Sequence, residues 1–343
     1  MNIQPRTFCI ANYIWIDDDG LKGKSKTLDK RPEKLSDLSD WSFACGRAEN
    51  SEQIIKPRAV FRDPFLGDPH VLVLCDRYNS DGTPHEKNYR FKAQEVFDRT
   101  PKDQHPWYGL EQEYVMVDTT TGTKLPLGFA ETAEKTPPQG PHYCGVGAGR
   151  VFGRDLADEH YKYCLDAGVK LCGINAELLH GQWEFQVGIC EGIEAGDHMW
   201  MARYILSRLG EKYNIAINYD PKPVEGDQWS ASGMHCNFST QPMRVDGGMS
   251  HIMTATEALR EKHKEHIIQY GDNKGRMLGE SADNFTLGIG NRSCSVRVTG
   301  DVASQGKGYL EDRRPSSNAD PYIVSMMLAD TVCVEKETPK GSA

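Results

Sequence analysis

The segment over residues 182–190 (QWEFQVGIC) most constrains the fold, because it alternates apolar and polar residues. Successive side chains of a β-strand point to opposite sides of the sheet, so one face of this strand must be buried in a core. The second face presents oxygen acceptors, which indicates a polar cavity on that side. The apolar face is predicted to carry Trp183, Phe185, Val187 and Ile189, and the polar face Gln182, Glu184 and Gln186.

Further carboxylates lie near strand-like segments. Glu111 and Glu113 lie two apart in WYGLEQEYVMVD and are expected to share a face, and Glu177 lies shortly before Glu184. Buried like charges repel unless they share a proton or a cation lies between them. Oxygen-rich sites of this kind suit Mg²⁺ or Mn²⁺. The alternative for either pair alone is a set of solvated surface glutamates.

Composition restricts the class of protein. The 343 residues predict one large domain or two unequal ones, with 26% charged and 38% hydrophobic residues. A net charge of −9 argues against a nucleic-acid binder. We expect no membrane-spanning segment, because apolar runs in the sequence are too short. We also expect no secretory signal. The ten cysteines include no C-x-x-C pair and are expected to be reduced, which favours a cytoplasmic enzyme.

The order of predicted elements favours an α+β fold, with a smaller β-rich domain before a catalytic one. The segments 17–40 and 131–150 are expected to be loops, and Pro101–Pro106 is expected to be a linker. Helices are predicted from Asp155 to Gly168, over 195–210 and over 250–271. Strands are predicted at 8–17, 59–65, 70–78, 172–189, 230–240 and 293–299.

A histidine and several arginines are further candidates. His235 is expected to share a strand face with Asn237 and Ser239. A lone strand histidine is more often a core residue, but neighbouring carboxylate strands favour a metal ligand. Arginine carries a rigid fork of donors that matches carboxylate and phosphate oxygens, which suggests anionic substrates. The candidate arginines are Arg292, Arg297, Arg313 and Arg314, the last two close to Glu311.

Several segments resemble those of glutamine synthetases of the eukaryotic type. The matching stretches run from about residue 10 to the C-terminal end and include WYGLEQEY, PQGPHYCGVGA, INAELLHGQWEFQVG, CEGIEAGDH, MHCNFST, NRSCSVRV and KGYLEDRRPSSNADPY. The resemblance implies a small β-grasp-like N-terminal domain over residues 1–103 and a catalytic domain over 104–343 built on a curved antiparallel sheet. It also implies a cytoplasmic homo-oligomer, a decamer of two pentameric rings.

The implied reaction is the ATP-dependent ligation of ammonia to L-glutamate through a γ-glutamyl phosphate, as part of glutamine biosynthesis. Metal ligands for Mg²⁺ or Mn²⁺ would be Glu113, Glu177 and Glu184 at one cation, and Glu111, His235 and Glu311 at a second. ATP would contact Glu111, Glu184, Phe185, Gln186, Val187, Gly188, Ile189, Asn237, Phe238, Ser239, Arg292, Arg297, Tyr309, Leu310 and Glu311. Glutamate would contact Gln228, Trp229, Arg292 and Arg313, and the catalytic residues would be Glu280, Arg292, Arg297 and Arg313.

Three departures from the family pattern bear on activity. Ala44 and Cys45 stand where the family carries an Asp-Gly that serves ammonium, and only Glu49 and Glu52 are carboxylates nearby. The segment 229–233 reads WSASG in place of Trp-Asn-Gly-Ala-Gly, and the flap is shortened to residues 276–281. The alternatives are therefore an active ligase, a non-catalytic or impaired paralogue that binds ATP and metal, and a ligase for another amine or acid. An imperfect gene model would also explain the residues that are missing near Ala44 and in the flap.

Overall fold

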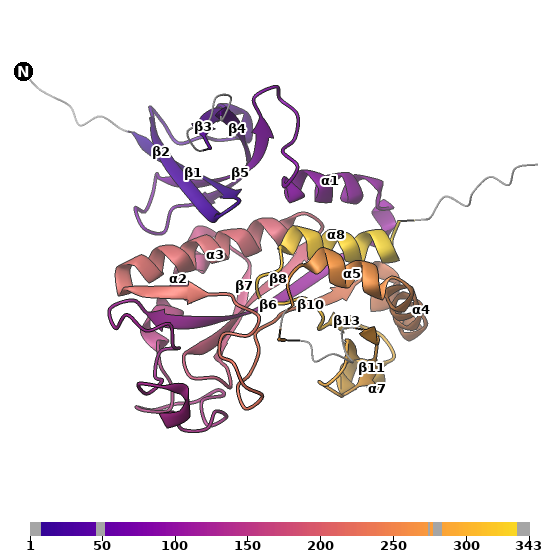
Figure 1. The fold of residues 1–343 in the computed structure, drawn as a ribbon. Coiled ribbons are helices and arrows are strands. Elements are labelled where there is room, and N and C mark those ends of the chain that lie inside the picture. Colours follow the sequence, from indigo (N-terminus) through magenta and orange to yellow (C-terminus); the bar gives the residue numbers. More distant parts are fainter. Residues whose placement is uncertain (1–7, 46–51, 274, 277–282, 335–343) are drawn as a thin grey trace, which may run out of the picture.

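The computed structural model describes residues 8–45, 52–273, 275–276 and 283–334. Within them, a five-stranded sheet in the order β2-β1-β5-β4-β3 lies above a larger sheet in the order β11-β12-β13-β10-β6-β8-β7, to which β9 adds beside β6 (Figure 1). This arrangement confirms the predicted α+β class.

The small sheet contains β1 (Cys9–Asp17), β2 (Gly20–Leu28), β3 (Trp41–Ala44), β4 (Glu52–Arg62) and β5 (Val71–Asn79). The large sheet contains β6 (Trp107–Asp118), β7 (Leu171–Ala176), β8 (Gln182–Glu191), β9 (Ile215–Asn218), β10 (Met234–Ser239), β11 (Leu287–Ile289), β12 (Val296–Val298) and β13 (Leu310–Asp312).

Both faces of the central strands β1 and β5 of the small sheet are largely buried. Alternate residues of β1 separate into two cores, with Ile14 in the main core and Tyr13 and Trp15 in a second cluster under Leu38. The prediction of a loop over 17–40 is wrong, because β2 forms a hairpin with β1 across these residues. Lysines on its exposed side made β2 look like a loop, but charged residues are typical of an edge strand.

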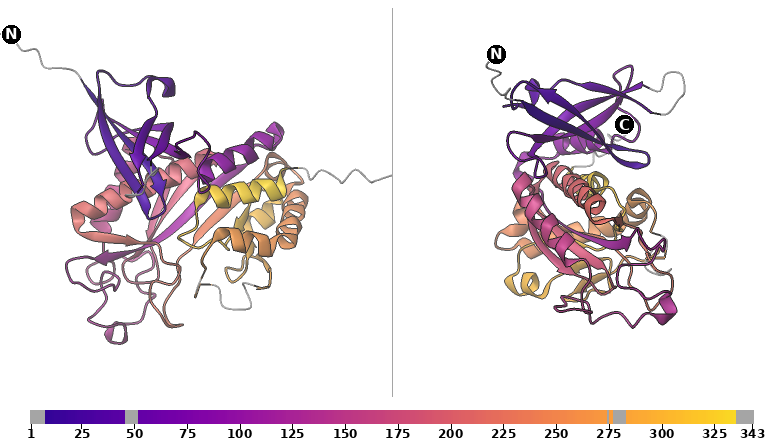
Figure 2. Two further views of the ribbon diagram at one scale, coloured as in Figure 1. Left: turned by 45° about the horizontal axis from the view of Figure 1, so that its top comes forward. Right: turned by 90° about the vertical axis from the view of Figure 1, so that its left-hand side faces the viewer.

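The large sheet separates a core from a polar face. Its pairings are antiparallel except for β11 with β12. On β10, Met234, Cys236 and Phe238 are fully buried in the main core, as the alternation predicted. The helices shown in Figure 2 cover this core side and leave the opposite face of the central strands for polar residues.

The helices differ in part from the prediction. The predicted helix over 250–271 is two helices, because the chain leaves helical geometry at Lys262 (φ −97°, ψ 11°). The end of α2 at Gly168, with φ of 89°, is confirmed, since glycine adopts this left-handed conformation readily. The helices are α1 (Tyr89–Arg99), α2 (Arg154–Ala167), α3 (Glu194–Tyr213), α4 (Gly248–Glu261), α5 (His263–Tyr270), α7 (Gly300–Gln305) and α8 (Pro321–Val332).

Helices α1 and α8 pack against each other, and neither was predicted from the sequence. Helix α8 is apolar on almost every side and largely buried, so it lacks the amphipathic periodicity of a surface helix. It also contacts β6, since the Tyr108 hydroxyl donates to the Ser325 carbonyl at 3.0 Å. Among the described residues, no helix combines the length and apolar character that crossing a membrane requires.

Candidate active site

Strand register brings the predicted carboxylates to one face of the large sheet. Glu113 on β6 lies directly opposite Glu184 on β8. On the other side of β6, Glu111 lies opposite His235 on β10. Neighbouring side chains at such positions lie about 5 Å apart, so four functional groups meet on the polar face of three adjacent strands.

Two groups of three potential ligands result, and Glu184 belongs to both. One group contains Glu113, Glu177 and Glu184, and its ligand atoms lie within 4.8 Å of one another. The other contains Glu111, Glu184 and His235 within the same limit. The first group is the ligand set predicted for one cation. The second group differs from the predicted set, because it contains Glu184 in place of Glu311. Glu184 therefore connects the two groups.

The electrostatics of these groups fit divalent cations. Burial, with the nearby charge of Glu111, raises the pKa of Glu184 to about 8. Burial, with the charge of Glu113, raises the pKa of Glu177 to about 7. Burial acts against ionisation of Glu111 too, but the hydrogen bond and charge of His235 hold its pKa at about 2. A cation among these oxygens would relieve the repulsion, and carboxylates with one imidazole suit Mg²⁺ or Mn²⁺.

Short hydrogen bonds fix the carboxylates. The Gly233 amide donates to Glu113 at 2.6 Å, and Asn175 donates to Glu177 at 2.8 Å. Gln186 donates to Glu184 at 2.7 Å. Asn237 donates to Glu111 at 2.8 Å. Each carboxylate therefore keeps one oxygen held by the protein, which orients the other oxygen for a ligand.

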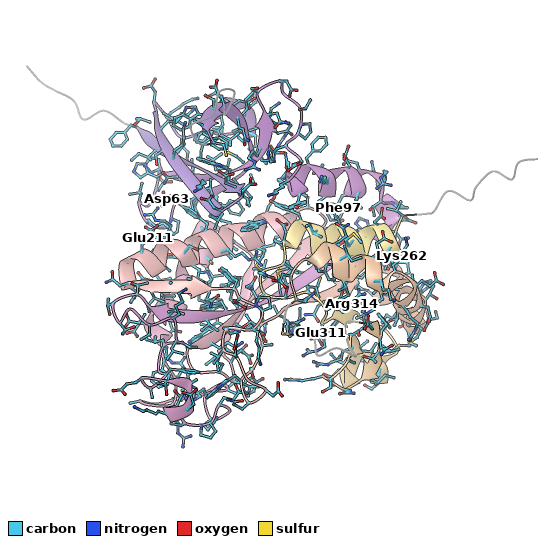
Figure 3. All side chains as sticks on the ribbon, viewed as in Figure 1. Asp63, Phe97, Glu211, Lys262, Glu311 and Arg314 are labelled. Carbon is cyan, nitrogen blue, oxygen red and sulfur yellow. The ribbon has the colours of Figure 1, made fainter. Side chains whose placement is uncertain are left out.

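Arginines adjoin the cluster through Glu311. Its carboxylate pairs with Arg297 at 3.0 Å and with Arg313 at 2.5 Å, and lies 3.9 Å from His235 Nδ1. Arg314, one residue further along, instead lies in the core and pairs with Asp312 at 2.8 Å (Figure 3). Alternation along this segment thus directs Glu311 and Arg313 to the site and Asp312 and Arg314 away from it.

A cavity of about 370 Å³ adjoins the polar face at the start of β6. It is lined by five of the residues predicted to contact ATP, together with the first three residues of β6. Arg244 closes one wall, since its guanidinium lies 3.8 Å from the ring centre of Trp107 and donates to Ser239 Oγ at 2.9 Å. The predicted residues in its lining are Ile189, Asn237, Phe238, Ser239 and Tyr309.

Comparison with known proteins identifies the family. The sequence pattern described as "Glutamine synthetase, catalytic domain" matches residues 90–257. The chain is 47% identical over 338 residues to the glutamine synthetase of Agaricus bisporus, which covers 95% of this chain and 94% of that protein. It is also 47% identical to the chloroplastic/mitochondrial glutamine synthetase of Arabidopsis thaliana, over 97% of this chain and 80% of that protein.

The chain belongs to the glutamine synthetase family. A solved structure titled "Apo GmaS without ligand" matches 94% of this chain and 77% of its own, with a TM-score of 0.70. At 18% identity this likeness supports the fold alone. The eukaryotic-type resemblance inferred from the sequence motifs is thereby confirmed by the relatives from fungi and plants.

Some of the residues predicted to contact ATP direct their side chains into the core and away from the polar face. Phe185, Val187 and Leu310 are almost completely buried in the core. Ile189 was predicted to join them but is 62% exposed, because the β6–β8 register shifts at Gly188 and reverses the alternation. A Cβ atom at Gly188 would lie 2.8 Å from the Tyr108 carbonyl oxygen, which explains the glycine.

The remaining predicted site residues differ in their exposure to solvent. Trp229 is buried beside Phe129, and its indole N–H has no partner among the described residues. Gln228 and Arg292 are exposed. Glu280 and Glu49 lie outside the described residues, whereas Ala44 ends the edge strand β3, opposite the exposed Glu52.

Three residues near the site were absent from the predicted set. Trp107 and Arg244 line the cavity, but their contact depends on folding and leaves no sequence signal. Arg276 was noted only as the start of the flap. It donates to the carbonyl of Arg313 at 2.8 Å, and burial lowers its pKa to about 10. A Cβ atom on Gly233 would lie 2.6 Å from its guanidinium and 2.9 Å from His235 Nε2, so a larger residue there would displace one of these side chains.

Proposed function

We propose that this protein is a glutamate–ammonia ligase, which joins ammonia to L-glutamate at the expense of ATP through a γ-glutamyl phosphate. The observation that carries the proposal is the carboxylate cluster that shares Glu184, together with the cavity at the start of β6 and the arginines paired with Glu311. The names of the relatives support the same activity.

In this proposal, Glu113, Glu177 and Glu184 hold one divalent cation, and Glu111 and His235 hold a second with Glu184 or Glu311. When bound, the cations would offset negative charge on the phosphoryl group during transfer. Trp107 and Arg244 bound the space for the nucleotide, which would lie against Ile189 and Tyr309. Positioning and charge neutralisation account for most of the catalysis of phosphoryl transfer.

Arg292 and Arg313 would hold the glutamate and the transferring phosphoryl group, with Trp229 and Gln228 beside them. Arg313 is already oriented by Glu311 at 2.5 Å. Glu280, which corresponds to the family's flap glutamate by resemblance, would be a further catalytic residue. Exclusion of water would protect the acyl phosphate from hydrolysis.

The ammonium side is where this chain departs from the family. Ala44 offers no carboxylate to ammonium, and contact attraction of this kind is worth about 1 to 4 kcal/mol in a partly wetted site. Its loss would weaken apparent ammonium affinity by roughly tenfold to several hundredfold. Hydroxylamine arrives as a neutral nucleophile, so its reaction should suffer less.

A coupled assay tests the proposal directly. Purified protein with Mg²⁺-ATP and glutamate should form glutamine from ammonium with a high KM, and γ-glutamyl hydroxamate at a larger relative rate. Ala44→Asp should lower the ammonium KM, with Ser42→Asp on the same strand as a matched control. ATP binding without turnover of either nucleophile would favour the non-catalytic paralogue, and preference for a different amine would favour the third alternative.

We also propose the decamer of two pentameric rings and a cytoplasmic location, both implied by the family resemblance. In that assembly the small sheet of one subunit would complete the site of its neighbour. Sedimentation velocity should give a single species of about ten chains. A stable, active monomer would contradict this part of the proposal.

A further inference from the structure

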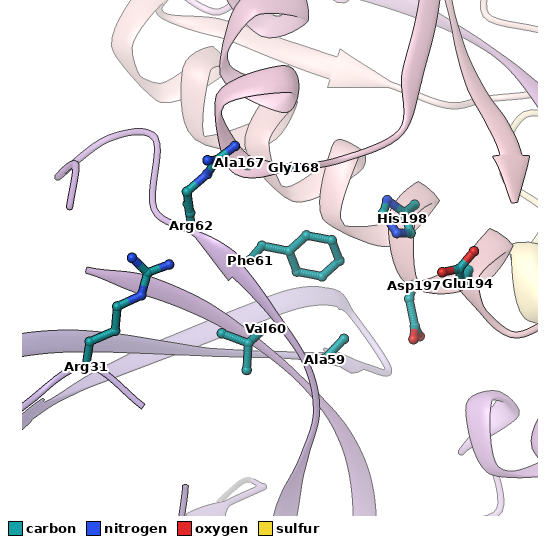
Figure 4. A pocket seen from close by; sticks show the side chains of 10 residues that line it. All are labelled: Arg31, Ala59, Val60, Phe61, Arg62, Ala167, Gly168, Glu194, Asp197 and His198. Atoms are coloured by element: carbon teal, nitrogen blue, oxygen red, sulfur yellow. The ribbon is translucent and has the colours of Figure 1, made fainter. Parts of the chain in front are cut away.

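A second cavity of about 370 Å³ lies between β4 of the small sheet and the facing ends of α2 and α3. It shares no lining residue with the nucleotide cavity. Figure 4 shows Phe61 at its centre, with Arg31 and Arg62 on one side and His198 on the other. The cavity therefore has an apolar middle between two polar ends.

The arginine end carries positive charge that the protein does not fully offset. Arg62 donates through Nε to the Asp166 carbonyl at 2.7 Å but forms no ion pair with any described side chain. Arg31 pairs with Asp68 at 2.5 Å, and that carboxylate is largely exposed to solvent. Both guanidinium groups keep donors for an anion, and arginine binds carboxylates through paired hydrogen bonds.

The opposite end offers a neutral hydrogen-bond donor. His198 Nδ1 accepts from the Lys170 amide at 3.0 Å, and burial lowers the pKa of His198, so its ring proton is on Nε2. The acidic neighbours do not attract a cation, because Glu194 pairs with Lys170 at 2.6 Å and Asp197 pairs with Arg90 at 2.8 Å. Both ends of the cavity therefore favour oxygen acceptors.

We propose that this interdomain cavity is a second ligand site, which binds a small linear dicarboxylate. One carboxylate would lie against Arg31 and Arg62, the carbon chain against Phe61 and Val60, and the second carboxylate would accept from His198 Nε2. Such a ligand contacts both domains, so its binding stabilises one orientation of the small sheet relative to α2 and α3.

Two hydrogen-bonded paths join this cavity to the nucleotide cavity. Lys170, whose amide donates to His198, accepts from the Gly188 amide at 2.8 Å, and the next residue, Ile189, lines the nucleotide cavity. The second path starts at Glu194.

Glu194 accepts from the Glu191 amide at 3.3 Å, and the Glu191 carboxylate accepts from Trp107 Nε1 at 3.3 Å. Trp107 lines the nucleotide cavity. Because both paths end on residues of that cavity, a dicarboxylate between the domains changes nucleotide affinity. This coupling rests on the proposed nucleotide site, whereas dicarboxylate binding does not.

Calorimetric titration of glutarate into the full chain tests the binding, in the absence of glutamate, because glutamate is itself a small dicarboxylate and would compete. Wild-type protein should show a saturable site that depends on Arg62 and His198. Arg62→Ala and His198→Phe should each weaken it by about tenfold or more, since a charge-assisted hydrogen bond is lost in the first and a donor in the second. Arg99→Ala, which removes an exposed arginine elsewhere, should bind as the wild type does.

Saturable binding by wild type that is unchanged in both Arg62→Ala and His198→Phe would overturn the site, as would no saturable binding at all. The coupling is measured as the affinity for a non-hydrolysable ATP analogue with and without glutarate. A change of about threefold or more in wild type, lost in Arg62→Ala, supports it. Glutarate binding without any such change overturns the coupling alone, and absence of analogue binding overturns the proposed nucleotide site.

Discussion

Replacing Glu184 by glutamine should leave the metal-free protein intact and remove its response to cations. The pKa of Glu184 rises from 4.5 to about 8, which corresponds to about 5 kcal/mol against its ionised form. Without a cation the carboxyl is therefore mostly protonated near neutral pH. Glutamine matches the protonated carboxyl in shape and charge, so the free energy of unfolding should change by less than about 1 kcal/mol.

The cation-bound state should respond strongly. The attraction between a divalent cation and a carboxylate about 4 Å away is about 8 kcal/mol at an effective dielectric of 20. Releasing the proton of a group with pKa about 8 at neutral pH offsets about 1.4 kcal/mol of this. The remainder predicts cation binding weaker by about a hundredfold or more. At a Mg²⁺ concentration about 100 times the wild-type Kd, stabilisation would fall from about 2.7 kcal/mol to about 0.4 kcal/mol or less.

Urea unfolding with and without Mg²⁺ measures both effects. Glu131→Gln, at an exposed bend where Glu131 pairs with Lys135, is the matched control and should behave as wild type. Glu113→Gln should weaken only one of two calorimetric cation sites, because Glu113 belongs to one group. Full Mg²⁺ stabilisation of Glu184→Gln would refute the shared-ligand reasoning. A large loss of stability in its metal-free form would refute the assignment of the protonated state.

The raised pKa values of Glu177 and Glu184 predict that Mn²⁺ raises the Tm more as pH rises from about 6 to about 8.5, since protons compete with the cation below the folded-state pKa. In metal-free protein Glu177 and Glu184 bind more protons than they do in the unfolded chain. Their contribution to the free energy of unfolding should therefore decline as pH rises from about 4.5 to about 8. Stability that does not change with pH, with or without Mn²⁺, would contradict these two predictions. Asp312→Asn should destabilise by about 3 to 5 kcal/mol in urea unfolding, because it leaves the fully buried Arg314 without its anion, and a cost below about 1 kcal/mol would contradict that account. Arg244→Ala should raise the KM for ATP several-fold with little change in kcat, and an effect on kcat alone would place Arg244 outside nucleotide binding.

Period-two alternation predicted the polar face well, because it depends only on local geometry. It placed His235 opposite the core-facing Met234 and Phe238 and put Glu111 and Glu113 on a shared face, as the strand register shows. The same reasoning failed at Ile189, where an irregular pairing with β6 reverses the faces. Gly188 is the one local sign of this irregularity, because a glycine inside a strand often marks a bulge.

Contacts between distant segments could not be predicted from the sequence alone. The sharing of Glu184 by two ligand groups arises from the packing order β8-β6-β10, which no local pattern encodes. Likewise, Trp107 and Arg244 lie far apart along the chain and meet only in the fold. Helix α8 was missed because apolar residues on almost every side remove the periodicity that identifies a helix.

The position of α8 has a consequence for synthesis of the protein on the ribosome. Its residues cover the core side of the sheet and contact β6, α1 and α3, all of which are made much earlier. Until residue 332 has emerged, these partners have an exposed apolar surface and the main core lacks one wall. Chains of this size fold through partly packed intermediates that aggregate readily. The nascent chain should therefore depend on chaperones for most of its translation, while the small sheet closes its own second cluster soon after β5 appears.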